Sequence, residues 1–170
     1  MIKGRAELTE SDVKKIEEEI EDRKLNKRPT LIEAVKEARA QGDLSENFEY
    51  YAAKKAKNEN ESRIRYLDNM LKYAVIVTDR SNAGEVGMNN FVEVEFTDDH
   101  TRERYKIVTS IRGNSLKNYI STESPIGKAL MGHKVGDICH VHVNDGVSYD
   151  VKIINIDENE DDSEDEIKSF

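Results

Sequence analysis

The fold of the first half of the chain is decided by the stretch EARAQGDLSENFEYYAAKK, residues 37–55. Its Gly42 is the only glycine between Gly4 and Gly84, and it follows an apolar pattern of helical period, where the C-cap of a helix belongs. A second helical pattern begins at Phe48. Helices joined by so short a connection pack as antiparallel neighbours, so the stretch predicts the turn of a helical hairpin.

Upstream of this turn, the sequence predicts a long amphipathic helix. Thr9 is a suitable N-cap, and Ile16 and Ile20 continue an apolar stripe at helical spacing. Proline has no N–H and disrupts a helix interior, so we expect a kink or a restart at Pro29. The pattern runs over 32 positions, from Thr9 to Ala40, which at about 1.5 Å per residue makes a rod of roughly 45 Å.

Downstream of the turn, the helical pattern continues to about Tyr73. Residues 1–76 are therefore expected to form an antiparallel coiled-coil hairpin. Asn60 lies where the apolar stripe requires an apolar residue, and we expect a local weak point there.

Residues 77–156 have the pattern of a β domain. Apolar and charged residues alternate over Phe91–Phe96, and Asn144–Gly146 is a hairpin turn. Ser124, followed by Pro125, begins a short helix. The sequence thus predicts an α+β protein, in which the helical hairpin precedes an antiparallel sheet with one short helix.

The remaining residues, 157–170, form an acidic tail. They carry eight acidic side chains and one basic side chain, so they supply most of the chain's net charge of −9. A block of like charge repels itself and cannot bury a core, so we expect this tail to be disordered.

Composition excludes several classes of protein. No run of about 18 apolar residues predicts a membrane span, and the N-terminus lacks the apolar core of a secretory signal. A single cysteine, Cys139, makes neither an internal disulfide nor a thiolate zinc site. His140 and His142 share a strand face, but without a third ligand nearby they predict an exposed face rather than a metal site. A cytoplasmic protein without a membrane partner is the simplest interpretation.

The hairpin turn carries two carboxylates, Asp43 and Glu46, three residues apart. Asp-x-x-Glu at a helix start is also a capping box, and this structural role is a common one for such a pair. The functional alternative is Mg²⁺ binding, since Mg²⁺ is held by one or two protein carboxylates together with waters and substrate phosphates. On a solvated turn two carboxylates would bind it weakly, so a partner would have to supply the other ligands.

Basic residues flank the turn on both sides. Arg39 precedes it, and Lys54, Lys55 and Lys57 follow it. From their spacing alone they indicate a solvated helix face. The functional alternative is that they neutralise phosphates beside the acidic turn.

Two ordered motifs resemble bacterial transcription elongation factors of the GreA/GreB family, and most closely its GreA branch. One motif is RPTLI at 28–32, followed by residues 37–54; the other is Ile120-Ser121, followed by SPIGKALMGHKVGD at 124–137. The resemblance covers about residues 8–156. It implies a helical hairpin that enters the secondary channel of RNA polymerase and an FKBP-like C-terminal domain that docks on the channel rim.

The resemblance also implies a function and its residues. Asp43 and Glu46 would help to hold a Mg²⁺ ion shared with the polymerase active site, which then cleaves backtracked RNA near its 3′ end. The chain itself would be a monomer that is not an enzyme and has no cofactor of its own. The residues implied to face the RNA or the polymerase at the tip are Arg39, Ser45, Asn47, Tyr50, Lys54 and Lys55. Those implied in docking are Ser121, Ser124, Pro125, Ile126 and Gly127.

Two alternatives remain open from the sequence. A secondary-channel regulator would inhibit or modulate transcription without stimulating cleavage. A prolyl isomerase would use the FKBP-like fold, although the second half has no tryptophan and no aromatic pocket cluster.

The sequence departs from the family pattern in four places. Asp12 stands where the opening motif usually has glycine, and Asn89-Asn90 replaces a Gly-Ser-like turn. Residues 109–112 lack an acidic stretch, and the acidic tail is an addition. The departure at 109–112 bears on docking rather than on the chemistry of the hairpin turn. Asparagine tolerates positive φ, so the turn at 89–90 can survive, and the tail has no family role to transfer.

Overall fold

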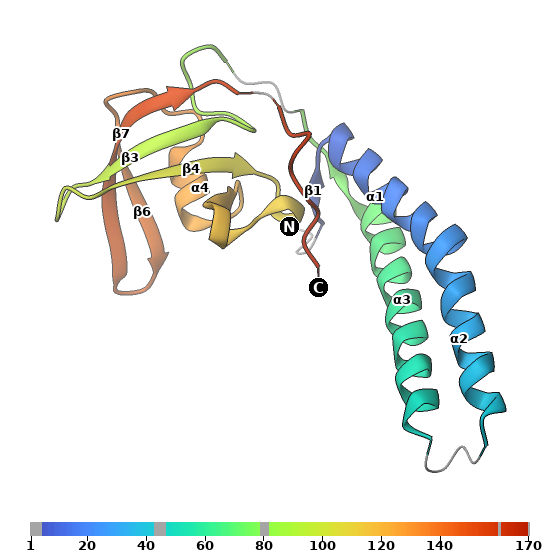
Figure 1. Ribbon diagram of the computed structural model, residues 1–170. Helices are drawn as coiled ribbons and strands as arrows, with labels where there is room; N and C mark the ends of the chain where they lie inside the picture. The colour runs from blue at the N-terminus through green and yellow to red at the C-terminus, as the bar shows by residue number, and fades with distance from the viewer. Residues whose placement is uncertain (1–4, 43–46, 79–81, 160, 170) are drawn as a thin grey trace. The chain divides into compact units, whose positions relative to one another are not determined.

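The computed structural model describes residues 5–42, 47–78, 82–159 and 161–169. These residues form two compact units, one comprising Arg5 and residues 12–74 and the other residues 6–11 together with 75–169 (Figure 1). Residues 6–11 and 75–76, expected in the hairpin, fall in the second unit, where strand β1 (Glu7–Leu8) pairs with strand β2 (Val75–Ile76) in parallel. In the described part of the chain no helix is long and apolar enough to cross a bilayer.

The first unit is the predicted helical hairpin. Its first arm consists of α1 (Glu10–Asp22), a π-helical segment η1 (Arg23–Lys27) and α2 (Arg28–Ala40), and its second arm is α3 (Phe48–Tyr73). Side chains near the start of the first arm contact those near the end of the second, so the arms are antiparallel. Gly42, just past the end of α2, has a φ of 128°, which glycine adopts readily.

The restart expected at Pro29 takes the form of the π-helical segment η1. Pro29 has no N–H to continue the α-helical ladder and lies in the first turn of α2. Just before it, the N–H of Arg28 donates to the carbonyl of Arg23, five residues earlier. One wider turn therefore joins the two helices of this arm without breaking it.

Asn60, where the sequence predicts a weak point, has hydrogen-bond partners on the other arm. Its side chain is buried, and its oxygen accepts a hydrogen bond from Nη1 of Arg23 at 3.0 Å. Its side-chain nitrogen donates to the carbonyl of Arg23 at 3.3 Å, the same carbonyl that closes the π turn. The polar side chain thus links the two arms where the first arm changes its helical geometry.

The second unit is built on a five-stranded sheet with the strand order β5-β4-β3-β7-β6. The strands are β3 (Phe91–Phe96), β4 (Arg102–Val108), β5 (Tyr119–Ser121), β6 (Ile138–Asn144) and β7 (Val147–Asp157). The sequence predicted an antiparallel sheet, but β4 and β5 pair in parallel, so the sheet is mixed. The connection between them contains two short 3₁₀ turns, η2 (Ser110–Arg112) and η3 (Ser115–Lys117), which let the chain return in the same direction. The expected α+β class is confirmed.

One face of this sheet carries the core, which includes the short helix α4 (Pro125–Leu130). Alternate residues of the strands point into the core, as the period of a strand requires. Cys139 is buried there, in agreement with its predicted core position. The buried members of the core are Val86, Val92, Val94, Ile107, Leu130, Cys139, Val141, Val151 and Ile153.

The acidic tail has defined contacts where the sequence predicted disorder. Asp165 is only 4% exposed, and its carboxylate pairs with Lys106 and Arg112 of the second unit. Counting charge along the sequence could not show that two buried cations compensate this carboxylate. For the described residues 161–169, the prediction of a disordered segment is therefore wrong.

Candidate functional site at the hairpin tip

The two carboxylates of the predicted site, Asp43 and Glu46, lie outside the described residues, as does Ser45. Their roles at the tip stay predictions. The structure does describe the chain on both sides of them, from Gln41-Gly42 at the end of α2 to Asn47 at the start of α3.

Asn47 joins the two helix ends at the tip. Its side-chain oxygen accepts a hydrogen bond from the N–H of Tyr50 at 3.0 Å, which makes it the N-cap of α3. Its side-chain nitrogen donates to the carbonyl of Ala38 at 2.7 Å, in the last turn of α2. A single amide therefore satisfies one free donor and one free acceptor of the two helices. The N-cap of α3 is Asn47, and the capping box predicted on Asp43 and Glu46 lies outside the described residues.

Arg39 and Tyr50 meet beside this joint. The guanidinium carbon of Arg39 lies 5.8 Å from the centroid of the Tyr50 ring, within cation–π range. A hydrogen bond from Arg39 is the largest cause of a lowered pKa at Tyr50, and the positive charges of Lys54 and Lys57 add to the lowering. The structure thus brings together three of the predicted tip residues, Arg39, Asn47 and Tyr50.

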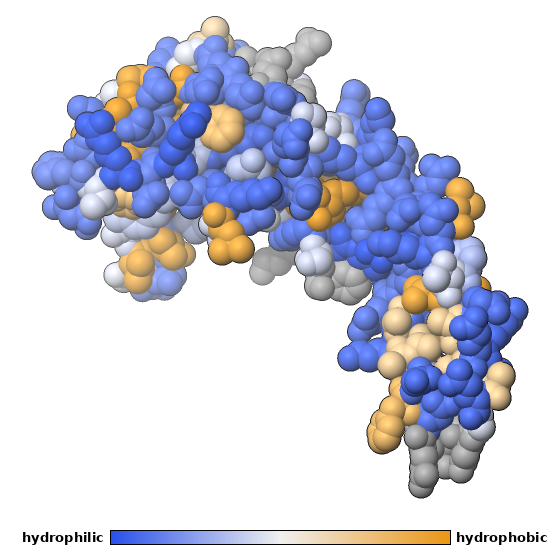
Figure 2. Space-filling view, in the orientation of Figure 1, coloured by the Kyte–Doolittle hydropathy of each residue, from blue (hydrophilic) through white to orange (hydrophobic). Residues whose placement is uncertain are grey.

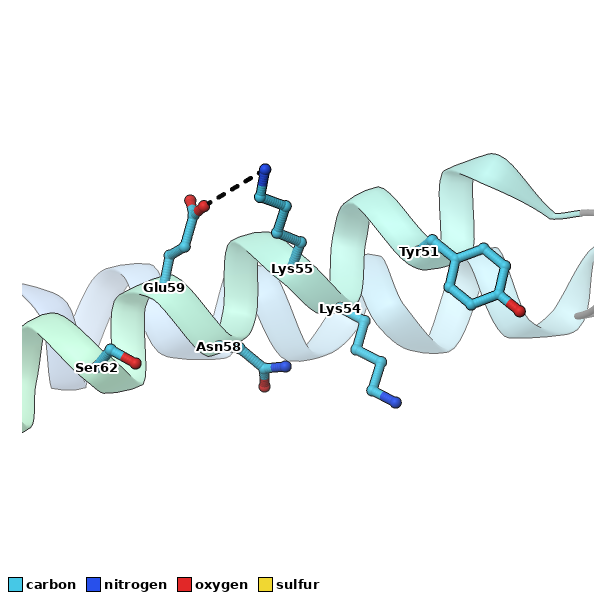
Figure 3. A pocket seen from close by; sticks show the side chains of 6 residues that line it. All are labelled: Tyr51, Lys54, Lys55, Asn58, Glu59 and Ser62. Atoms are coloured by element: carbon cyan, nitrogen blue, oxygen red, sulfur yellow. Dashed lines mark ion pairs between the residues drawn. The ribbon is translucent and has the colours of Figure 1, made fainter.

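Further along α3 the predicted lysines lie on an exposed face. Tyr51, Lys54, Asn58 and Ser62 line a hollow along the helix together with Lys55 and Glu59 (Figure 3). Lys55 pairs with Glu59 at 3.9 Å, whereas Lys54 points away from that pair (Figure 3). The two lysines therefore do not form one cluster.

Two large aromatic side chains near the tip are also solvent-exposed. Phe48 is 85% exposed and Tyr51 is 52% exposed, in a molecule whose visible surface is mostly hydrophilic (Figure 2). Tyr51 packs edge-on against Tyr50, with 5.6 Å between the ring centroids. This side of the tip therefore offers both apolar area and positive charge to a partner.

Charged side chains clamp the arms of the hairpin to each other. Arg63 of α3 donates to both carboxylate oxygens of Glu19 in α1, at 3.0 and 3.3 Å, and Arg23 donates to the same carboxylate at 2.8 Å. Burial alone would raise the pKa of Glu19, but the hydrogen bonds from Arg63 and Arg23 outweigh it and lower that pKa below its ordinary value. The carboxylate is therefore held in its charged form.

A second clamp lies closer to the tip. Arg28 donates to both oxygens of Glu61, at 2.7 and 2.9 Å, in the bidentate geometry that suits a guanidinium and a carboxylate. Its hydrogen bond lowers the pKa of Glu61. Sequence reasoning missed both clamps, although charges opposite one another in a predicted antiparallel hairpin were a signal that could have found them.

The predicted docking residues come together in the second unit, at the junction of β5 and α4. Ser124 is the N-cap of α4, accepting from the N–H of Gly127 at 3.1 Å and donating to the carbonyl of Ser121 at 2.6 Å. A Cβ on Gly127 would lie 1.9 Å from that same carbonyl oxygen, so only glycine fits there. Pro125 and Ile126 form the first turn of α4. The fold alone accounts for the serine and the glycine, and their role in docking stays a prediction.

His140 and His142 lie on the exposed side of β6, as expected. Nδ1 of His140 is 2.7 Å from a carboxylate oxygen of Asp150 on β7. Within the described ranges, no group of three or more metal-ligating side chains is assembled.

Comparisons with known proteins follow the division into hairpin and sheet. Residues 6–76 match the family described as "Transcription elongation factor, N-terminal", and residues 81–158 match "Transcription elongation factor, GreA/GreB, C-term". Together the two matches cover most of the chain.

Individual relatives agree with the family match. Transcription elongation factor GreA of Lachnoclostridium phytofermentans is 42% identical over 150 residues, 88% of this chain and 93% of that protein. The protein of the same name from Staphylococcus saprophyticus is 40% identical over 149 residues, 88% of this chain and 94% of its own length. Among solved structures, GreA factor homolog 1 of Thermus thermophilus is 28% identical, with a TM-score of 0.41 and coverage of 90% of this chain and 99% of its own. The chain belongs to the GreA/GreB family of transcription elongation factors.

Proposed function

We propose that this chain is a transcript cleavage factor, which inserts its hairpin into the secondary channel of RNA polymerase and stimulates cleavage of backtracked RNA. The second unit would dock on the rim of that channel through the junction of β5 and α4. The polymerase performs the chemistry, and the factor completes the metal site. Family membership supports a role in transcription elongation. The hydrogen-bonded helix ends at the tip support the more specific role in RNA cleavage.

The observation that carries the proposal is the joint made by Asn47. It fixes the end of α2 to the start of α3, on either side of the sequence positions 43–46. The clamps Arg63–Glu19 and Arg28–Glu61 tie the arms behind the tip. A carboxylate that must reach an ion deep inside a partner needs such a stiff support. The positional freedom of a loose arm would lower the effective concentration of the carboxylate at the ion.

Asp43 and Glu46 have the chemistry that the metal requires. Carboxylate oxygens are the protein ligands that Mg²⁺ prefers, and it accepts one or two of them while phosphates and waters complete the octahedron. When bound, the ion would stabilise charge on the attacking and leaving oxygens of an in-line phosphoryl displacement. Arg39 and Lys54 would neutralise RNA phosphates beside the two carboxylates.

The test is a cleavage assay on a stalled polymerase complex with a labelled RNA 3′ end. The double variant Asp43→Asn with Glu46→Gln should bind the polymerase as the wild type does but release short 3′ fragments about a hundredfold more slowly, since two ligand charges are lost. The matched control is Glu37→Gln with Glu49→Gln, which removes two exposed carboxylates from the helices next to the same turn and should leave the rate unchanged.

Two outcomes would reject the proposal. If the wild type binds and inhibits transcription without producing short 3′ fragments, the chain is a secondary-channel regulator. If the double variant cleaves as fast as the control, the carboxylates are not the functional groups.

A further inference from the structure

The C-terminal segment contacts the sheet unit through a buried charge cluster that the proposed function does not use. One oxygen of Asp165 lies 2.7 Å from Nζ of Lys106, and its other oxygen lies 2.7 Å from Nη1 of Arg112. The side chains of all three are at least 96% buried. Arg112 also donates to the side-chain oxygen of Asn89 at 2.6 Å, which directs the guanidinium toward Asp165.

The cluster is built by residues far apart in the sequence. Lys106 lies in β4, and its ammonium is 5.6 Å from the centroid of the Phe91 ring and 5.2 Å from that of the Tyr119 ring. Arg112 ends the 3₁₀ turn η2. Asn89 has a φ of 67°, in the left-handed region that asparagine tolerates better than most residues. The departures from the family pattern at 89–90, at 109–112 and in the tail therefore meet at one place.

The same site also binds the backbone of the segment. Nζ of Lys106 donates to the carbonyl of Asp161 at 3.0 Å, and the N–H of Lys168 donates to the carbonyl of Ile111 at 2.8 Å. The segment is thus bound through its backbone at two positions and through one carboxylate at a fixed position, just after a turn closed by the N–H of Asp165 and the carbonyl of Asp162. A phosphate would satisfy the two cations but not the backbone contacts.

Burial makes the carboxylate a requirement of the site. Two cations taken out of water are costly unless an opposite charge and hydrogen bonds compensate them. Asp165 supplies both, with one oxygen for each cation. Its neighbour Glu164 is exposed, so the site selects one position of the acidic run and not its general charge.

We propose that Lys106, Arg112 and Asn89 form an acidic-peptide-binding site on the C-terminal unit, and that residues 161–169 of the same chain are its ligand through Asp165. The ligand belongs to the same chain, but it can leave the site and be replaced there by a free peptide. The site adjoins the predicted docking motif, because Ser110, next to Ile111, places its hydroxyl 2.8 Å from that of Ser121.

The first measurement is hydrogen exchange of the Lys168 amide in the full chain. In the wild type this amide should be protected by its hydrogen bond to Ile111, and Asp165→Asn should accelerate its exchange by about tenfold or more, since hydrogen bonds to charged groups are lost. Glu164→Gln removes the same charge one residue away and should leave the exchange rate at the wild-type value. Equal rates in all three proteins would overturn the proposal.

The second measurement asks whether the ligand is separable. A labelled peptide of residues 161–169 should bind saturably to the full-length Asp165→Asn protein, and at least about tenfold more weakly to the wild type, whose site is filled. The same peptide carrying Asp165→Asn should lose about tenfold in affinity as well. Absence of saturable binding, or equal binding of both peptides, would show that the segment is only a folded part of the domain. Displacement by an RNA oligonucleotide and not by unlabelled peptide would identify a phosphate site and equally overturn the proposal.

Discussion

The two units of this protein are stabilised by different kinds of interaction. The hairpin has only two arms, and buried polar residues such as Asn60 and Arg63 lie beside its apolar contacts. The sheet unit has a continuous apolar core of nine buried residues, from Val86 to Ile153. In the hairpin, ion pairs between the arms accompany a small set of buried apolar residues, whereas the sheet unit is held by close apolar packing.

This difference suits the two proposed roles. A hairpin that must enter a narrow channel cannot carry a thick apolar core, so hydrogen-bonded ion pairs fix its arms. A docking domain has no such limit on its width. Substitutions should therefore affect each unit by its own mechanism and leave the other unit intact.

The largest effect is expected at the close approach in the sheet unit. Gly127→Ala places a methyl group 1.9 Å from the carbonyl oxygen of Ser121, and the rigid backbone there cannot yield, so the unit should lose about 3 kcal/mol of stability. Lys128→Ala, an exposed change on the same helix, should cost less than about 0.5 kcal/mol. Chemical denaturation followed by amide exchange in β3, β4 and β7 would measure both. Simultaneous loss of protection in α3 would contradict the independence of the two units.

The next effect is expected at the clamp between α1 and α3. Arg63→Ala leaves Glu19 without its bidentate partner, and because that carboxylate is still 22% exposed, the cost should be about 2 kcal/mol and not the full penalty of a buried charge. Loss of helical circular dichroism on urea unfolding would report it. Arg65→Ala, on the exposed face of α3, is the control and should stay close to the wild type. If the two variants were equally stable, apolar contacts alone would hold the hairpin.

A smaller effect is expected at the tip. Asn47→Ala removes the N-cap of α3 and the hydrogen bond to Ala38, and should cost about 1 kcal/mol, expressed mainly as faster amide exchange at Tyr50. Asn47→Asp keeps the cap acceptor but loses the donor. It should restore the protection of Tyr50 without restoring the joint to α2. Full recovery of the cleavage rate in Asn47→Asp would show that the joint is not needed.

The smallest effect is expected from acidification. The pKa of Glu19 in the folded protein is below its ordinary value of 4.5, so its charged form stabilises the hairpin fully above that pH, and this stabilisation is lost as the pH falls through the lower, folded value. The difference in stability between the wild type and Glu19→Gln should therefore shrink between pH 7 and pH 3. Urea unfolding at the two pH values measures it, and a constant difference would disagree with a lowered pKa.

Much of this architecture is predictable from local patterns. The position of Gly42 and the helical periods on both sides of it are enough for the hairpin, and Ser124 with Pro125 is enough for the start of α4. Capping and periodicity are properties of neighbouring residues, so one sequence shows them.

The features that local patterns miss depend on distant partners. In the sequence Asn60 only interrupts an apolar stripe, because its hydrogen-bond partner, Arg23, belongs to the other arm. In the sequence Asp165 is one of several carboxylates in an acidic run, because the two cations that pair with it, Lys106 and Arg112, are more than 50 positions away. The parallel pairing of β4 with β5 depends on two short 3₁₀ turns, which leave little trace in hydrophobic periodicity.

The most direct test of the account is the Mg²⁺ dependence of RNA cleavage in a backtracked polymerase complex. Bound wild-type factor should lower the Mg²⁺ concentration that gives half-maximal cleavage, because two further carboxylates join the ligands of the ion. The Asp43→Asn, Glu46→Gln protein, present at saturating concentration, should leave that concentration where it is without any factor. If the doubly neutralised protein lowers the required Mg²⁺ as far as the wild type does, the central claim of tip carboxylates shared with the polymerase is contradicted.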